Sequence, residues 1–257
     1  PDTTSNMALA GFTPTSGLVD PDYRTPAWDA QFRAVAQIAF RELQLLVGRS
    51  YGVSWLDSYS TSDQPPVDRS ESDESLLLPS ALRTAREVLG PDEHPFPLRY
   101  ATRQLSLRIE PSVYLDAMVR DVLRFGGRIN IRAFDDPRDL MSVIEPVIVN
   151  CTGLGSRVLF GDETVVPAKG QLTFLAPQPE VNYRTQGGLT PQPGIGLHMM
   201  PRADGIALGG TSERGVWSLE PDAEARRRVV EGHMALYSAM CAQPRSGQSM
   251  SSVSSHG

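Results

Sequence analysis

The stretch Val147–Arg157, V-I-V-N-C-T-G-L-G-S-R, decides the fold that this sequence predicts. Its first three residues form a β-branched run that favours a buried parallel strand. Asn150–Gly153 follow, and none of these side chains is large enough to keep a ligand away. In open α/β sheets ligands bind beyond the carboxyl ends of the strands, where a glycine lets them approach the backbone. We therefore predict a strand that ends at a nucleotide cofactor; an ordinary buried strand with a tight exit is the alternative.

Composition and charge narrow the class of protein. The chain has 257 residues, of which 40% are hydrophobic and 21% charged, so it can build one large domain or two interleaved domains. A net charge of -6 and the lack of long Lys/Arg runs argue against nucleic acid and anionic membranes as partners. No uninterrupted apolar stretch is long enough to span a bilayer, so we expect no membrane partner either.

The cysteines bear on compartment and metal binding. There are 2 of them, Cys151 and Cys241, which excludes a disulfide scaffold and argues against a zinc site. They favour a reducing compartment, and we expect a cytoplasmic protein without a bound metal. Because the chain begins at Pro1, we leave open whether a leader sequence has been removed.

Three tracts are polar and poor in apolar residues. The first twelve residues are expected to form a loop. Ser58–Ser75 contains Pro65-Pro66, which blocks regular structure, and is predicted to be a long surface loop. Residues 243–257 are rich in Ser, Gly and Gln and are predicted to be a disordered tail.

Capping residues and apolar spacing predict three helices. Thr25 caps the first, Pro26 takes its first position and Gly48 ends the pattern. Pro111 opens the second, which Gly126-Gly127 stop. The apolar stripes are Trp28, Phe32, Val35, Ala39, Leu43 and Leu46 in the first helix, and Leu115, Met118, Val119, Val122 and Phe125 in the second. The third helix starts at Pro221, with Ala225, Val229, His233 and Leu236 on one side and Glu224 four residues before Arg228.

The strand signals differ between the two halves of the chain. The first half has extended runs that fit a layered α/β domain, at Tyr51–Leu56, Leu105–Ile109, Arg128–Phe134 and Val147–Val149. The second half has short runs at Gly170–Leu175, Gly196–Met200 and Gly205–Leu208. Ala203-Asp204-Gly205 supplies a hairpin turn between the last two runs, so this half favours an antiparallel sheet.

Five motifs stand in chain order along most of the sequence. They are T-T-S-N-M-A (Thr3–Ala8), G-G-R-I-N-I-R-A-F (Gly126–Phe134), the Val147–Arg157 stretch, V-P-A-K-G-Q-L-T-F (Val166–Phe174) and M-P-R-A-D-G-I-A-L-G-G-T (Met200–Thr211). Together they resemble the D-amino-acid oxidase family of FAD-dependent oxidoreductases. The resemblance reaches from Thr3 to Tyr237, and N-C-T-G followed by P-x-x-G-Q is more specific than a lone glycine-rich turn.

The resemblance implies an α/β fold of mixed α+β character, in which an incomplete Rossmann-like FAD-binding domain interleaves with an antiparallel-sheet substrate domain. We expect residues 1–14 and 111–165 in the FAD-binding domain, and residues 15–110 and 166–242 in the substrate or cap domain. The family also has a G-x-G-x-x-G phosphate cradle and an R-P-x-R-P segment whose arginine binds the substrate carboxylate. Neither occurs in this sequence, so we expect a fragment that is truncated at both ends.

The same resemblance implies FAD as the cofactor and a set of residues that bind it. Hydroxyls and backbone amides of the N-terminal loop approach the flavin and pyrophosphate, while a later strand and strand end contact the adenine side. The implied residues are Thr4, Ser5, Leu9, Ala10, Gly11, Phe134, Thr152 and Gly153. From the residues alone, a terminal loop or a helix N-cap is the preferred interpretation of Thr4 and Ser5.

Substrate contacts are implied less directly. His198 and Gly194 stand where the family has tyrosines of the active site, so the sequence departs from the family at both positions. A protonated His198 can pair with a carboxylate, although a lone histidine on a strand is more often structural. Gln171 either points toward the flavin or lies on the sheet surface, and Trp217 is expected to pack under the preceding loop.

For the complete enzyme the resemblance implies oxidation of D-amino acids by hydride transfer to the flavin, without a side-chain base. The products are a 2-oxo acid, ammonia and hydrogen peroxide, so the partners are a small D-amino acid and O2, with a homodimer left open. A glycine or sarcosine type of flavin amine oxidase is one alternative. The other is a noncatalytic fragment of such an enzyme.

Overall fold

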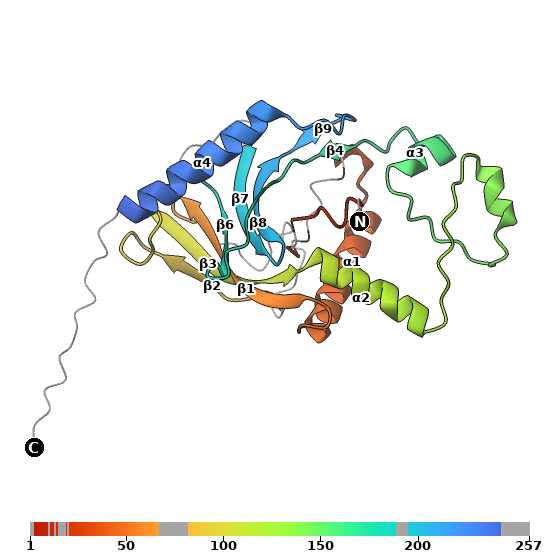
Figure 1. The fold of residues 1–257 in the computed structure, drawn as a ribbon, viewed down its shortest axis with the longest axis horizontal. Coiled ribbons are helices and arrows are strands. Elements are labelled where there is room, and N and C mark those ends of the chain that lie inside the picture. Colours follow the sequence, from red (N-terminus) through yellow and green to blue (C-terminus); the bar gives the residue numbers. More distant parts are fainter. Residues whose placement is uncertain are drawn as a thin grey trace, which may run out of the picture.

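The computed structural model describes residues 3–9, 11–12, 14, 19, 21–66, 82–188 and 195–242. They form a mixed α/β fold around a seven-stranded sheet with the order β2-β3-β1-β6-β7-β8-β5 (Figure 1). Its strands are β1 (Val53–Ser62), β2 (Arg86–Leu89), β3 (Tyr100–Ile109), β5 (Thr173–Leu175), β6 (Tyr183–Gln186), β7 (Ile195–Arg202) and β8 (Gly205–Thr211). Neighbouring strands are antiparallel except β1 and β6, which are parallel. The predicted fold class, with its antiparallel sheet, is confirmed.

The remaining elements surround this sheet. The helices are α1 (Pro26–Leu45), α2 (Pro111–Arg124), α3 (Gly155–Phe160) and α4 (Ala223–Ala242), with the short 3-10 helices η1 (Pro21–Tyr23) and η3 (Pro137–Ser142). A separate pair of strands joins β4 (Ala168–Lys169) to β9 (Glu213–Arg214). Figure 1 shows α4 lying across the sheet and α3 within a segment that extends away from it. Among the described residues, no helix is both long and apolar enough to cross a membrane.

The two faces of the large sheet have different surroundings. Leu197, Met199, Ile206 and Leu208 pack against Val229 of α4, and Val53 and Leu107 pack against Phe40 of α1. We call this side the helix face. Because side chains alternate along a strand, the residues between these positions point to the other side, which we call the opposite face. It carries Leu56, Ser58, Arg184, His198, Met200 and Arg202.

Helix α1 begins as predicted, but its buried face differs. The Thr25 side chain accepts a hydrogen bond from the Trp28 N–H, and Pro26 occupies the first helical position. The buried residues are Ala36, Phe40 and Leu43, whereas Val35 of the predicted stripe is 53% exposed. Phe40 decides this orientation because it packs against both Leu107 of the sheet and the ring of Phe12.

Helix α2 ends as predicted, at a left-handed Gly126 with φ +84°. Its predicted apolar stripe does not form a core contact: Phe125 is 91% exposed and Val122 48% exposed. The buried residues of α2 are instead Pro111 and Ala117. The helix is therefore buried in its first two turns, where it follows β3, and its later part is held by the hydrogen bond from the Tyr51 hydroxyl to Asp121.

The hairpin of β7 and β8 is confirmed, with Arg202 paired to Gly205 across the Ala203-Asp204 turn. The predicted strand at 105–109 is present within the longer β3, and the one at 51–56 is present from Val53 on, as the start of the longer β1. The predicted surface loop at 58–75 is wrong over Ser58–Ser62, because these residues form the second half of β1 and pair with β3. Residues 67–75 and the predicted tail at 243–257 lie outside the described residues.

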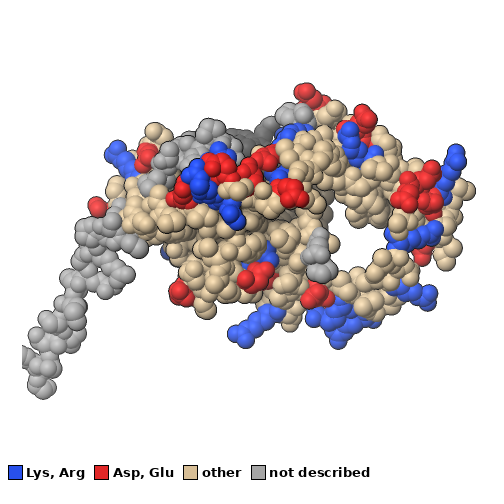
Figure 2. Space-filling model, turned by 45° about the horizontal axis from the view of Figure 1, so that its top comes forward, with Lys and Arg blue, Asp and Glu red and all other residues tan. Residues whose placement is uncertain are grey.

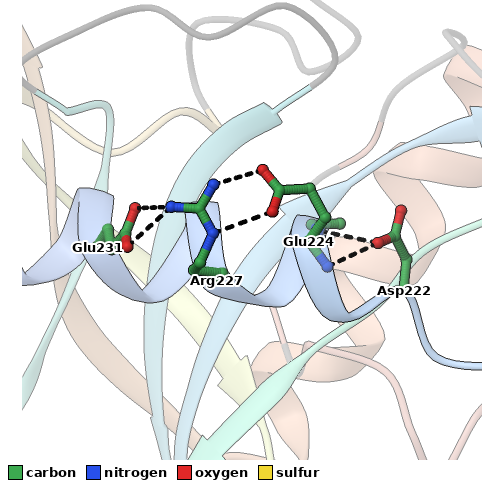
Figure 3. Close-up of polar contacts among 5 residues, drawn as sticks. Asp222, Glu224, Arg227 and Glu231 are labelled. Carbon is green, nitrogen blue, oxygen red and sulfur yellow. Dashed lines mark hydrogen bonds and ion pairs between the residues drawn. The ribbon is translucent and has the colours of Figure 1, made fainter.

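Helix α4 confirms its predicted buried side, since Ala225, Val229, His233 and Leu236 are all at most 3% exposed. It starts at Ala223, two residues after Pro221, because the Asp222 carboxylate accepts hydrogen bonds from the N–H groups of Glu224 and Ala225. Glu224 binds Arg227 rather than the predicted Arg228, and Arg227 also binds Glu231 (Figure 3). A single guanidinium thus bridges two turns of the exposed side.

The strands predicted at 128–134 and at 147–149 are wrong. Neither range contains a strand, and Ile131, Val147 and Val149 are 102%, 77% and 78% exposed. A strand needs a neighbour for its backbone hydrogen bonds, and no described strand lies beside these residues. Figure 2 shows an open gap between this part of the molecule and the rest. The Val147–Arg157 stretch therefore does not carry the packing that its β-branched residues predicted.

Gly52 lies where the start of β1 comes close to the start of α2. It has φ +65°, and a Cβ added there would lie 2.8 Å from Val113 Cβ and 2.9 Å from Glu110 Cβ. We predict that Gly52→Ala destabilises the protein by about 1–3 kcal/mol more than Gly126→Ala. Gly126 is the matched control because its φ is also positive but nothing lies within 4 Å of an added Cβ. Equal denaturant midpoints for the two variants would contradict the close approach.

Candidate functional site

Three polar side chains from neighbouring strands meet on the opposite face of the sheet. Ser58 of β1 stands beside Arg184 of β6 in the parallel register. His198 of β7 pairs with Gln186, two residues beyond Arg184, so the arginine and histidine are diagonal neighbours on one face. Ser58 and Arg184 are buried, at 3% and 4% exposure. The sheet therefore gathers a hydroxyl, a guanidinium and an imidazole in a region of low exposure.

His198 occupies space that only glycine leaves open. An added Cβ would lie 1.9 Å from the His198 Nε2 at Gly209 and 2.0 Å from its Cε1 at Gly210, so the imidazole lies directly over this backbone. Burial lowers the pKa of His198 below its usual 6.5, and the positive charge of Arg184 lowers the pKa further, against an opposing hydrogen bond with the Gly196 backbone. The imidazole is therefore neutral at pH 7 and does not supply the positive charge considered from the sequence.

Arg184 supplies that charge. Burial lowers the pKa of its guanidinium below the usual value, and no described residue forms an ion pair or hydrogen bond with that group. Removing a guanidinium from water without a partner costs several kcal/mol, and an anionic ligand that accepts two parallel hydrogen bonds offsets this cost. The arrangement favours binding of a carboxylate at this face.

Sequence reasoning missed Arg184. The signal was present in V-N-Y-R-T-Q, where Val181, Tyr183 and Thr185 alternate with polar residues in the manner of a half-buried strand. The strand is only four residues long and follows a proline-containing loop, so its period-2 pattern is short. The aromatic partner Tyr59 on β1, which contacts the Tyr183 ring edge-on, fixes which side of β6 faces the helices.

The N-terminal loop lies at the same face. Leu9 packs against Leu56 and Met200 on the opposite face, and Gly11 forms a bridge with Arg108 at the end of β3. Thr4 and Ser5 are exposed in a turn held by hydrogen bonds from the Asn6 and Met7 N–H groups to the Thr3 carbonyl. The structure thus brings Leu9 to the sheet face that carries His198. Ala10 lies outside the described residues.

The other predicted cofactor residues lie in the extended segment around α3 (Figure 1). Thr152 and Gly153 are exposed, and Phe134 is half-buried under the guanidinium of Arg132. Asn150 accepts hydrogen bonds from the Thr152 N–H and hydroxyl and donates to Ser156, which orders the turn before α3. The turn is pre-formed, but the structure does not pack it against the N-terminal loop.

Gln171 and Trp217, two further positions considered from the sequence, contact other residues of the chain. The Gln171 side chain donates to the Asp222 carbonyl and accepts from the Asp222 N–H, so it fixes the start of α4 instead of pointing freely from the sheet. Trp217 is 53% exposed and lies under the Arg157 guanidinium. Gly194 lies outside the described residues. Within those residues, no three His, Cys, Asp or Glu side chains are placed to hold a metal ion.

Comparisons with known proteins agree on the family. The family model described as FAD dependent oxidoreductase, DAO, matches residues 14–250. Human D-aspartate oxidase is 28% identical over 237 residues, which cover 92% of this chain and 65% of that enzyme. A D-amino-acid oxidase of Streptomyces coelicolor is 34% identical over 128 residues, or 50% of this chain and 38% of that enzyme. The chain thus spans less than two thirds of the length of these relatives.

Solved structures agree on the fold. Glycine oxidase from Geobacillus kaustophilus superposes with a TM-score of 0.58 and 15% identity, covering 91% of this chain and 68% of that one. L-proline dehydrogenase from P. horikoshii gives a TM-score of 0.55 and 14% identity, covering 83% and 64%. At these identities the likeness concerns the fold, a mixed α/β arrangement with a mostly antiparallel sheet.

Two buried histidines make stability depend on pH. His233 is 3% exposed, its Nδ1 bonds to the Val229 carbonyl, and its Nε2 has no partner among the described residues. Burial is the main cause that lowers the pKa of both His233 and His198 below 6.5. The unfolded chain therefore takes up these protons first as pH falls, so stability is full above pH 6.5 and is lost below it.

We predict that the denaturant midpoint of the wild type falls between about pH 7.5 and about pH 5.5. His233→Phe removes one of the two titrations and keeps a ring beside Tyr237, so its midpoint should fall less over the same range. Measurement near pH 8, where both imidazoles are neutral, gives the packing effect of the substitution alone. A pH dependence in the variant equal to that of the wild type would contradict the assignment.

Proposed function

The chain belongs to the DAO family of FAD-dependent oxidoreductases, and from that premise we propose that its protein binds FAD and oxidises D-amino acids that carry a second carboxylate. The observation that carries the proposal is Arg184 on the opposite face of the sheet, which is buried and has no partner among the described residues. The names of the relatives that match the chain, D-aspartate oxidase and D-amino-acid oxidase, support the same chemistry.

Residues of the N-terminal loop and of the turn before α3 have the chemistry that a flavin nucleotide needs. Thr4 and Ser5 present exposed hydroxyls, and the N–H of Leu9 has no acceptor among the described residues. Gly153 has open space where a side chain would stand, and the ordered Asn150–Thr152 turn lies beside it. Hydroxyls and free amides of this kind bind phosphate and flavin ring atoms. We assign Thr4, Ser5 and Leu9 to the flavin side and Thr152 and Gly153 to the nucleotide side.

When bound, FAD would supply the redox chemistry, the removal of a hydride from the substrate α-carbon. The chain's own residues orient the substrate. Arg184 binds one carboxylate in a bidentate pair, and Ser58 and neutral His198 line the same face. A fixed carboxylate holds the substrate α-carbon in one position, which is the main contribution a protein can make to such a transfer. The released imino acid hydrolyses to a 2-oxo acid and ammonia.

A flavin spectrum of the purified 257-residue chain tests cofactor binding directly. A yellow protein with flavin absorbance supports the proposal. A colourless one, after incubation with excess FAD, would favour a noncatalytic module of an oxidase. Turnover of a panel of D-aspartate, D-alanine, glycine, sarcosine and L-aspartate by the flavin-loaded protein then separates the oxidase types. A preference for glycine or sarcosine would contradict the substrate class that we propose.

Arg184 gives the sharpest prediction on substrate choice. Arg184→Gln should lower kcat/KM for D-aspartate by about a hundredfold or more, because a buried charge pair loses one partner. D-Alanine should lose much less, and Arg184→Lys, which keeps the charge but not the planar fork, should fall between. Equal losses for both substrates would mean that Arg184 binds the carboxylate common to all amino acids and would contradict the acidic preference.

A further inference from the structure

Arg202 is the second deeply buried arginine of the opposite face, with a side chain that is 3% exposed. It stands at the end of β7, before the Ala203-Asp204 turn. Unlike Arg184, its guanidinium forms four hydrogen bonds within the described residues. Nε donates to Asp204 Oδ1 over 2.8 Å and Nη2 donates to Asp204 Oδ2 over 2.6 Å, which is a bidentate pair. The Phe174 ring lies 5.0 Å from the guanidinium carbon and closes one side.

The remaining donors of Arg202 reach the N-terminal loop. Nη1 donates to the Ala8 carbonyl over 2.6 Å, and Nη2 donates to the Asn6 carbonyl over 3.4 Å. These are contacts across 194 and 196 positions in the chain. Arg202 therefore ties residues 3–9, which carry Thr4 and Ser5, to the hairpin of the sheet.

The hairpin that holds Arg202 is itself fixed. The Ala203 N–H donates to Glu110 Oε2 over 3.0 Å, and Arg108 donates to the Pro201 carbonyl over 3.3 Å. Arg108 and Glu110 form an ion pair of 3.3 Å with low exposure on both sides. The turn is thus held to the junction of β3 and α2. A rigid support of this kind transmits little motion to the loop.

The hydrogen bond between Arg202 and the Ala8 carbonyl also sets the direction of the next backbone N–H, that of Leu9. In a trans peptide the C=O of one residue and the N–H of the next point in opposite directions. The Ala8 carbonyl points at Arg202, so the N–H of Leu9 points away from it, and no described residue accepts a hydrogen bond from this N–H. Leu9 itself is held from the other side by its contact with Leu56 and Met200. One guanidinium therefore sets the orientation of an amide that the proposed flavin site uses.

We propose that Arg202 is a positioning residue, which holds the 3–9 loop so that the Leu9 amide and the Thr4 and Ser5 hydroxyls face the cofactor. This inference rests on the proposed function for the identity of the ligand. Asp204 orients the guanidinium, and Glu110 holds the turn. The residue acts on the cofactor site indirectly, through its hydrogen bonds to the Asn6 and Ala8 carbonyls.

Hydrogen exchange on the 257-residue chain without FAD tests the anchor. The Asn6, Met7 and Ala8 amides donate within the loop, so they report its order. In Arg202→Gln these amides should exchange about tenfold faster, while the amides of α4 stay as protected as in the wild type. Arg202→Lys should exchange more slowly than Arg202→Gln, because one donor to Ala8 is kept. Unchanged exchange of the loop in Arg202→Gln would overturn the proposal.

Arg103→Gln is the matched control. Arg103 forms a bidentate pair with Asp57 over 3.1 and 2.9 Å on the same sheet but contacts no residue of the loop. The FAD dissociation constant, from the quenching of flavin fluorescence, should rise about tenfold or more in Arg202→Gln and less than about twofold in Arg103→Gln. Equal rises in both variants would overturn the positioning role.

The hydrogen-exchange and FAD-binding measurements distinguish a failure of the Arg202 proposal from a failure of the proposed function. A wild-type chain that binds no FAD, even at saturating concentration, would contradict the proposed function. The exchange rates of residues 3–9 would still decide whether Arg202 anchors the loop. A wild type that binds FAD, with an ordered loop and unchanged affinity in Arg202→Gln, would instead overturn the inference and leave the function in place.

Discussion

A buried guanidinium needs a partner for its charge, and the opposite face of the sheet contains two that differ in this respect. Arg202 binds Asp204 and two backbone carbonyls, so its charge and donors are satisfied within the chain. Arg184 is equally buried and has no such partner among the described residues. A satisfied cation stabilises structure, whereas an unsatisfied one stores binding energy for an anion. The same residue type therefore has a structural role at one end of the face and, in our proposal, a ligand-binding role at the other.

This division depends on how the sheet separates its faces. The helix face is lined by apolar residues that pack on α1 and α4, such as Leu197, Met199 and Leu107. Apolar burial on that side supplies most of the stability, at about 25 cal/mol for each Å² removed from water. The opposite face can then bury polar residues, because the stability from the helix face offsets the free energy lost in removing them from water. Glycines 209 and 210 are part of this cost, because the His198 ring needs the space that a side chain would fill.

Local signals predicted the elements whose contacts are close in sequence. The cap at Thr25, the glycine stop at Gly126 and the turn at Ala203-Asp204 were each correct, because each depends on a few neighbouring residues. Val147–Val149 failed because β propensity describes a residue that fits into a sheet, and a strand forms only beside another strand. The same limit applies to the exposed Ile131 and Phe125.

The site was harder to predict than the fold. Leu9 and His198 were identified by resemblance, and the structure places both on one sheet face, while their roles stay predictions. Arg184 was missed because its strand is short and its importance lies in a missing partner, which no sequence pattern shows. The sequence places Arg202 in the Met200–Thr211 motif but gives no sign of its role. Two of its four hydrogen bonds connect positions nearly two hundred residues apart, and such contacts become visible only in three dimensions.

Strand β7 connects these roles through its spacing alone. His198, Met200 and Arg202 are alternate residues, so they point to the same face and follow each other about 7 Å apart. The first is the diagonal neighbour of Arg184, the second contacts Leu9, and the third binds the loop carbonyls. A shift of β7 by one residue would move all three to the helix face. The pairing of β7 with β8 therefore fixes the distance between the proposed substrate and cofactor sites, and the glycines opposite His198 hold that register because no other residue fits beneath the ring.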